Sequence, residues 1–253
     1  AQAAGEVAAN AGAPRAAGRA VAAAVPAAGR SGTGVGGAIL ENARLGVVAR
    51  VSMMSDAPYL ETDLQDLLAV EGLEFGLHFD LTHGPAKHLA RSFFASRSET
   101  SAELTRQLAG LRRLGIPVSH VDGHQHVHLL PHVISVLRET LRKERIAETR
   151  IPFDSRLWFS RRPFLNWLCL YARLMLKDEF SLRSCVYPQP RDFASVAAFT
   201  RLLSTTSNAE VIVHPAAFDD FDELGIPDGY RSGRVREFAL LKRLAVTPVQ
   251  SSY

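Results

Sequence analysis

The stretch from residue 101 to residue 153, SAELTRQLAGLRRLGIPVSHVDGHQHVHLLPHVISVLRETLRKERIAETRIPF, decides the fold class because helical and extended patterns alternate along it. Its first part, residues 101–114, carries leucines at helical spacing. Ser101 is the expected N-cap of this helix, and Gly115 is expected to end it. The spacing therefore predicts a helix that leads directly into the next segment.

The rest of the stretch continues the alternation. Residues 116–128 form an expected extended segment, Pro131 is expected to open a second helix, and residues 149–153 resemble a strand. Elsewhere we expect helices over 36–45 and 60–69 and strands over 47–53, 73–81 and 209–213. Strands that alternate with helices are typical of a parallel α/β architecture.

The composition excludes several protein classes. The 253 residues suit one α/β domain, and a net charge of +3 without a long Lys/Arg run disfavours a nucleic-acid partner. Cys169 and Cys185 show no CxxC spacing, so we expect no disulfide framework and a reducing, cytoplasmic location. No run of 18 apolar residues occurs, so we expect no membrane span.

Residues 1–33 are rich in Ala and Gly and contain no Leu, Ile or aromatic residue. We expect this low-complexity segment to be poorly ordered and the folded domain to span 34–253. The run Ala20–Val25 is short and weakly apolar, which disfavours a signal peptide. Its backbone can still pair as an Ala-rich strand.

Histidines concentrate in one place, since five of the nine fall within residues 120–132. In an extended segment alternate side chains share a face, so we expect Asp122, His124, His126 and His128 to project together. Imidazoles at this spacing suit a metal ion or a proton relay. The competing interpretation is a hydrogen-bonded strand end or a surface patch.

Two further histidines occupy expected strands. His78 interrupts the apolar segment 73–81, and His214 follows the β-branched run 211–213. A buried His must find partners, so a satisfied core residue competes with a functional one. His214 would stand at a strand end, where barrel enzymes gather their catalytic groups.

Taken in order, the peptides His78–Gly84, Asp122–His128 and His214-Pro215 resemble the YdjC-like (ChbG/HpnK) carbohydrate deacetylase family. The resemblance covers roughly residues 34–244. Further matching positions are Arg150-Ile151-Pro152, Tyr230, Arg234, Glu237 and Leu240.

The resemblance implies an irregular (β/α) barrel of the polysaccharide-deacetylase type. It also implies removal of N-acetyl groups from amino sugars, of the chitooligosaccharide or hopanoid-linked type, with one divalent cation, magnesium or zinc. His78 and His124 would ligate the cation, and His214 would be the general acid that protonates the departing amine. Side chains in the second shell or against substrate would be Asp122, His126, His128 and Arg150. Homo-oligomerisation stays open.

The sequence departs from the family at its first strand, which makes that strand degenerate. Register from Gly34 places Ala27 and Ala28 where the family carries an Asp pair, one Asp as base and one as metal ligand. We therefore expect impaired activity in this chain. A frame error, gene degeneration and true divergence all remain open as causes. The competing functions are a non-catalytic carbohydrate-binding relative and a metal-binding or scaffold protein.

Overall fold

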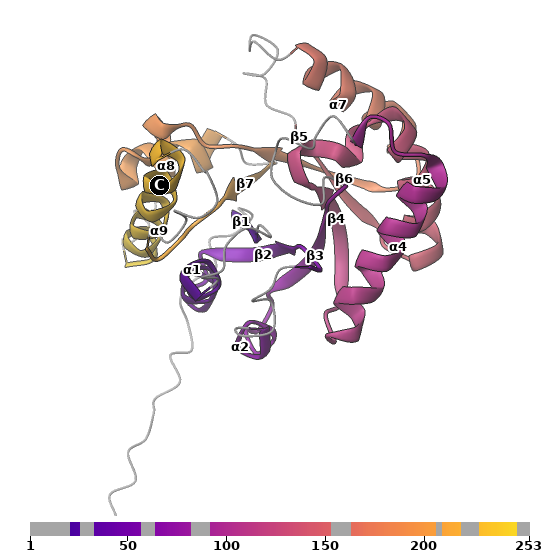
Figure 1. Cartoon of the computed structure of the whole chain (residues 1–253). Coiled ribbons are helices and arrows are strands. Elements are labelled where there is room, and N and C mark those ends of the chain that lie inside the picture. Colours follow the sequence, from indigo (N-terminus) through magenta and orange to yellow (C-terminus); the bar gives the residue numbers. More distant parts are fainter. Residues whose placement is uncertain are drawn as a thin grey trace, which may run out of the picture.

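The computed structural model describes residues 21–25, 33–56, 64–81, 92–152, 163–205, 209–218 and 228–246. Within these ranges a closed barrel of parallel strands runs in sequence order from β1 to β7 (Figure 1). The strands are β1 (Val21–Val25), β2 (Val48–Met53), β3 (Glu74–Phe79), β4 (Val118–Gly123), β5 (Glu148–Pro152), β6 (Ser181–Val186) and β7 (Ala209–Val213). The expected (β/α) barrel is confirmed.

Helices connect the strands and lie outside the barrel (Figure 1). They are α1 (Thr33–Arg44), α2 (Leu64–Leu68), α4 (Arg97–Arg113), α5 (Pro131–Glu144), α7 (Pro163–Leu176), α8 (Val196–Thr205) and α9 (Asp228–Val246). Two short 3-10 helices, η2 (His124–Leu129) and η3 (Pro190–Phe193), follow β4 and β6. Among the described helices none is long and apolar enough to cross a membrane.

The start of α4 differs from the sequence expectation. Ser96, not Ser101, caps the helix: its side chain accepts from the backbone N–H of Glu99, and the Glu99 side chain accepts from the Ser96 backbone. This reciprocal capping box satisfies two otherwise unpaired donors, so the helix begins earlier than expected. Pro131 does stand at the first turn of α5, as predicted.

Strand β1 closes the barrel although it lies within the low-complexity segment 1–33. It pairs in parallel with β2, where Val25 faces Met53, and with β7, where Ala23 faces Val213. Backbone hydrogen bonds require no particular side chain, so an Ala-rich strand can complete the ring. Residues 1–20 and 26–32, which include Ala27 and Ala28, lie outside the described residues.

The histidine-rich segment corrects another expectation, because it is extended only as far as Gly123. From His124 onward the chain turns into η2, and Gln125 (φ 48°) and His126 (φ 63°) adopt left-handed backbone conformations. Side chains in this turn do not alternate between two faces. Asp122, His124, His126 and His128 therefore do not form one strand-borne row.

Apolar side chains fill the layer between strands and helices. Val51, Leu77, Val121 and Ile151 are all fully buried there, together with leucines of α4 and α5. The neighbouring positions on the same strands carry charged or polar side chains that are also buried, such as Arg50 and Arg150. Because successive strand residues point to opposite faces, these polar side chains occupy the barrel interior.

Candidate active site

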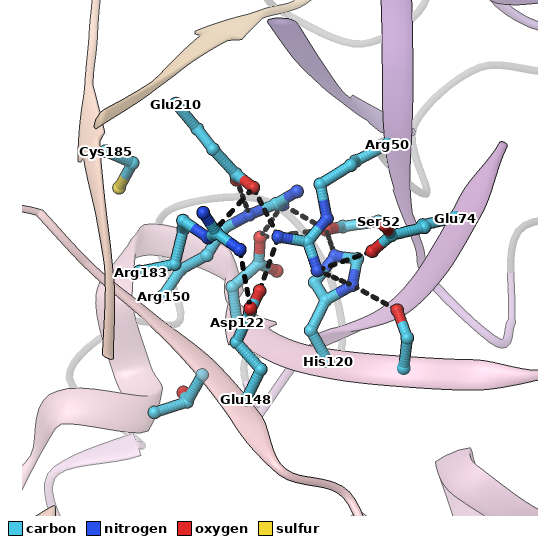
Figure 2. Close-up of polar contacts among 12 residues, drawn as sticks. Arg50, Ser52, Glu74, His120, Asp122, Glu148, Arg150, Arg183, Cys185 and Glu210 are labelled. Carbon is cyan, nitrogen blue, oxygen red and sulfur yellow. Dashed lines mark hydrogen bonds and ion pairs between the residues drawn. The ribbon is translucent and has the colours of Figure 1, made fainter. Parts of the chain in front are cut away.

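An ion-pair network occupies the interior of the barrel (Figure 2). Glu210 lies between two arginines, with Oε1 2.5 Å from Arg50 Nη1 and Oε2 2.5 Å from Arg150 Nε. Arg50 also pairs with Glu74 at 2.9 Å and with Glu148. Arg50, Arg150 and Glu210 are buried, and buried charges require opposite charges at close range, which these ion pairs supply.

Asp122 joins this network to the carboxyl end of the barrel. Its Oδ2 accepts from Ser52 Oγ at 2.9 Å and from Arg150 Nη1 at 2.6 Å. Burial alone would raise the pKa of Asp122, but His78 and Arg150 outweigh it, so the pKa lies well below its ordinary value. Asp122 is therefore an ionised carboxylate.

His78 contacts the other oxygen of this carboxylate. Its Nδ1 lies 2.6 Å from Asp122 Oδ1, within hydrogen-bond distance. The His124 ring stands nearly perpendicular to the His78 ring, with centroids 5.6 Å apart. Burial and the neighbouring His78 both lower the pKa of His124. The structure thus brings together the two histidines that the resemblance assigned to the metal.

His128 is buried and contacts the backbone of β5. Its Nε2–H donates to the carbonyl of Arg150 at 2.8 Å, and burial lowers its pKa to about 4. Gly123 makes room for this ring, because a Cβ there would stand 2.5 Å from His128 Nδ1. His128 is thus a neutral buried residue that ties η2 to β5.

His126 points elsewhere. Its ring meets the Tyr187 ring edge-on at 5.4 Å, with His128 at 6.5 Å. Tyr187 follows β6, so His126 helps to line the carboxyl end of the barrel beside that strand.

His214 directly follows β7 and is held by α9. Its backbone N–H donates to Glu237 Oε2 at 2.6 Å, and its carbonyl accepts from Arg234 Nε at 2.8 Å. Burial lowers the pKa of His214 to about 3, and the charges of Arg234, His78 and His124 act on the ring as well. Burial likewise raises the pKa of Glu237 to about 7. His214 is consequently neutral at pH 7.

The donors at this end of the barrel match two of the three ligands expected for a cation. His78 contacts Asp122 through Nδ1, and a carboxylate beside a ring nitrogen is common in metal-bound histidines. His124 is the second imidazole at this end. Over the described ranges, however, no group of three His, Cys, Asp or Glu side chains is placed to hold a metal ion. The third ligand of the expected set is missing from the described residues.

Most residues of the interior network were not predicted from the sequence. Arg50 and Ser52 on β2, His120 on β4 and Glu210 on β7 are all buried within it. Burial and the charges of Arg150 and Arg50 hold the pKa of His120 well below its ordinary value. Polar residues at every second position of otherwise apolar strands were the available signal, since this spacing puts them on one face. Cys169 and Cys185 are both free and buried.

The fold of this chain is similar to that of a solved structure. A crystal structure from Enterococcus faecalis, described as a cellobiose-phosphate cleavage protein, aligns over 89% of this chain and 92% of its own with a TM-score of 0.64. At 19% identity this likeness shows the fold alone. The sequence profile of the YdjC-like protein family matches residues 32–248. The chain belongs to the YdjC-like family.

Curated relatives of this YdjC-like chain are named carbohydrate deacetylase. The mouse protein is 32% identical and the human protein 30% identical over 141 residues, which is 46% of this chain. The matched region spans only 45% and 43% of those two relatives. The relative from Halalkalibacterium halodurans is 22% identical over 231 residues, 83% of this chain and 90% of its own length.

Proposed function

We propose that this chain binds N-acetylated amino sugars at the carboxyl end of its barrel and has the active-site framework of a metal-dependent deacetylase. The observation that carries the proposal is the junction of the Asp122–His78 pair with the His124 ring at this end. In barrel enzymes this end carries the chemistry. The relatives named carbohydrate deacetylase support the sugar as substrate.

A zinc or magnesium ion would be held by His78 and His124, and when bound it would polarise the acetyl carbonyl. Two neutral imidazoles make a weak site for magnesium, which prefers oxygen ligands, and an incomplete one for zinc. Ala27 and Ala28 cannot supply the carboxylates. We therefore propose weak metal binding and slow hydrolysis for this sequence.

His214 would act in proton transfer. Because its pKa is lowered to about 3, the ring is neutral and accepts a proton before it can donate one. Without an acidic pair, the same imidazole would take the proton of the attacking water and pass it to the departing amine. Glu237 and Arg234 fix the His214 backbone for this task.

The experiment compares this chain with the double variant Ala27→Asp/Ala28→Asp. Acetate release from N-acetylated chitooligosaccharides is measured with added zinc or magnesium. We expect the double variant to be faster by about 10²–10⁴-fold, the usual contribution of a general base. A matched control adds His78→Ala to the double variant and should abolish the gain. Equal rates for the chain and the double variant would remove the role assigned to the missing carboxylates.

The second candidate is a carbohydrate-binding protein without turnover. The observation that favours it is the presence of Ala27 and Ala28 at the two acidic positions. Calorimetry with an N-acetylated chitooligosaccharide distinguishes the two functions. Binding by the unmodified chain, with no acetate released even after the acidic pair is added, would support the binding protein.

A further inference from the structure

A continuous line of buried polar side chains connects His78 to the middle of the barrel. Asp122 stands between His78 and Arg150, with Oδ1 2.6 Å from His78 Nδ1 and Oδ2 2.6 Å from Arg150 Nη1. Ser52 Oγ donates to the same Oδ2 at 2.9 Å and also contacts Arg150. Both carboxylate oxygens of Asp122 thus have side-chain hydrogen-bond partners.

Arg150 is itself immobilised. Its Nε donates to Glu210 at 2.5 Å, and the other Glu210 oxygen lies 2.5 Å from Arg50. The exposed fractions are 1% for Arg150, 1% for Glu210 and 5% for Arg50. Figure 2 shows these side chains converging from β2, β4, β5 and β7. No rotation of Arg150 is possible without breaking a buried ion pair, which is strongly destabilising.

This arrangement has a chemical consequence for His78. Two donors, Arg150 and Ser52, stand on Oδ2, so Asp122 presents its second oxygen to His78 purely as an acceptor. The Nδ1 of His78 must then carry a hydrogen, and in the neutral ring the lone pair stays on Nε2, on the side away from Asp122. Only a lone pair can ligate a cation or accept a proton.

We propose that Asp122 is a positioning residue, held by Arg150 and Glu210, which fixes His78 in the tautomer with its lone pair on Nε2. The inference rests on the proposed function for its purpose, because that tautomer is the one able to serve a ligand or a proton at the carboxyl end. A purely structural role for the network is the alternative. It would make Asp122 important for stability but would leave the His78 tautomer unconstrained.

The test reads the tautomer directly, without substrate or metal. Two-bond ¹⁵N–¹H correlation spectra of the ring nitrogens of His78 should show hydrogen on Nδ1 in the unmodified protein. In Asp122→Asn, Arg150 and Ser52 retain the amide oxygen, which turns the NH₂ group towards His78. Nδ1 must then accept, and the hydrogen should move to Nε2.

Two controls keep the test specific. Asp66→Asn makes the same chemical change at an exposed ion pair with Arg44 on another element and should leave the His78 spectrum unchanged. Arg150→Lys retains a cationic donor near Asp122 and should retain the Nδ1-protonated form. If Asp122→Asn does not fold, the unmodified protein alone decides.

Hydrogen on Nε2 of the unmodified protein would overturn the inference, and so would an unchanged tautomer in folded Asp122→Asn. Loss of the Nδ1 hydrogen in Asp66→Asn would contradict it too. A confirmed tautomer in a protein that neither binds nor hydrolyses acetylated sugars would instead count against the proposed function. The two failures are therefore distinguishable.

Discussion

His128 makes the clearest prediction at the scale of a single residue. Its folded pKa is about 4, whereas the ordinary value is 6.5. As the pH falls through 6.5 the unfolded chain takes up a proton that the folded chain refuses until about pH 4. Stability is therefore lost over that window.

The expected size of this effect follows from the pKa difference. Between pH 7 and pH 5, His128 should contribute about 2 kcal/mol of lost stability. In His128→Gln the fall in unfolding free energy between these pH values, measured with urea, should be smaller by that amount. Val133→Ala, a buried change on α5 that titrates nothing, should retain the full pH dependence. A His128→Gln variant as pH-sensitive as the unmodified protein would contradict the assignment.

Individual residues also show where sequence reasoning succeeded and failed. The resemblance grouped His78 and His124 as metal ligands; the structure places their ring centroids 5.6 Å apart, and the metal role stays a prediction. The prediction that the four polar side chains of residues 122–128 share one face was wrong, because Gln125 and His126 adopt left-handed backbone conformations. The side-chain pattern does not predict these conformations. The partners of Asp122 depend on strand register between β2, β4 and β5, which a single sequence does not specify.

At the scale of an element, α7 has one apolar face that is buried and one that is exposed. Its inner face buries Leu168, Ala172 and Leu176, while Trp167 and Leu174 on the outer face are 52% and 60% exposed. Phe164, Trp167 and Tyr171 stack along the outer side. A helix that is apolar all round is ordinarily covered on both faces.

The same substitution on each face of α7 separates the two. Leu176→Ala should reduce the unfolding free energy by about 2–5 kcal/mol, because it leaves a cavity against the barrel. Leu174→Ala should change it by less than about 0.5 kcal/mol. Chemical denaturation of the two variants at equal protein concentration makes the comparison. Equal losses would show that the outer face is covered in solution, which would support the homo-oligomer that the sequence left open.

Element boundaries were predictable where local chemistry is explicit. Pro131 opens α5 as expected, and strands β2, β3, β5 and β7 fall within or close to their predicted ranges. The N-cap of α4 could have been predicted from the capping-box pattern Ser96-x-x-Glu99. Ser101 has no Glu or Gln three residues later. Strand β6 went unnoticed because its pattern, with exposed Ser181 and Arg183, is only partly apolar.

At the scale of the whole molecule, the barrel uses charge where many barrels use apolar layers. Its described interior holds paired arginines and carboxylates (Figure 2), beside a small apolar cluster of Cys185 and Ile212. Composition alone could not show this, because charged residues are expected at the surface. The architecture itself was predictable, since alternating strands and helices leave few ways to bury both faces of a parallel sheet.

Strand β1 decides how this architecture relates to function. It closes the ring, and its carboxyl end lies beside Met53 of β2, at the end of the barrel where His78 and His124 meet. In the sequence, Pro26 separates the end of this strand from residues 27 and 28. We therefore propose that the barrel is closed while the described residues supply only part of a metal-ligand set.

Zinc titration of the chain and of Ala27→Asp/Ala28→Asp, followed by calorimetry at pH 7, tests this claim most directly. A carboxylate adds the negative ligand that two imidazoles lack. The double variant should bind one zinc ion at least about tenfold more tightly, a change of about 1.4 kcal/mol. His78→Ala in the double variant should cancel the gain. Equal zinc affinity in the chain and the double variant would contradict the account.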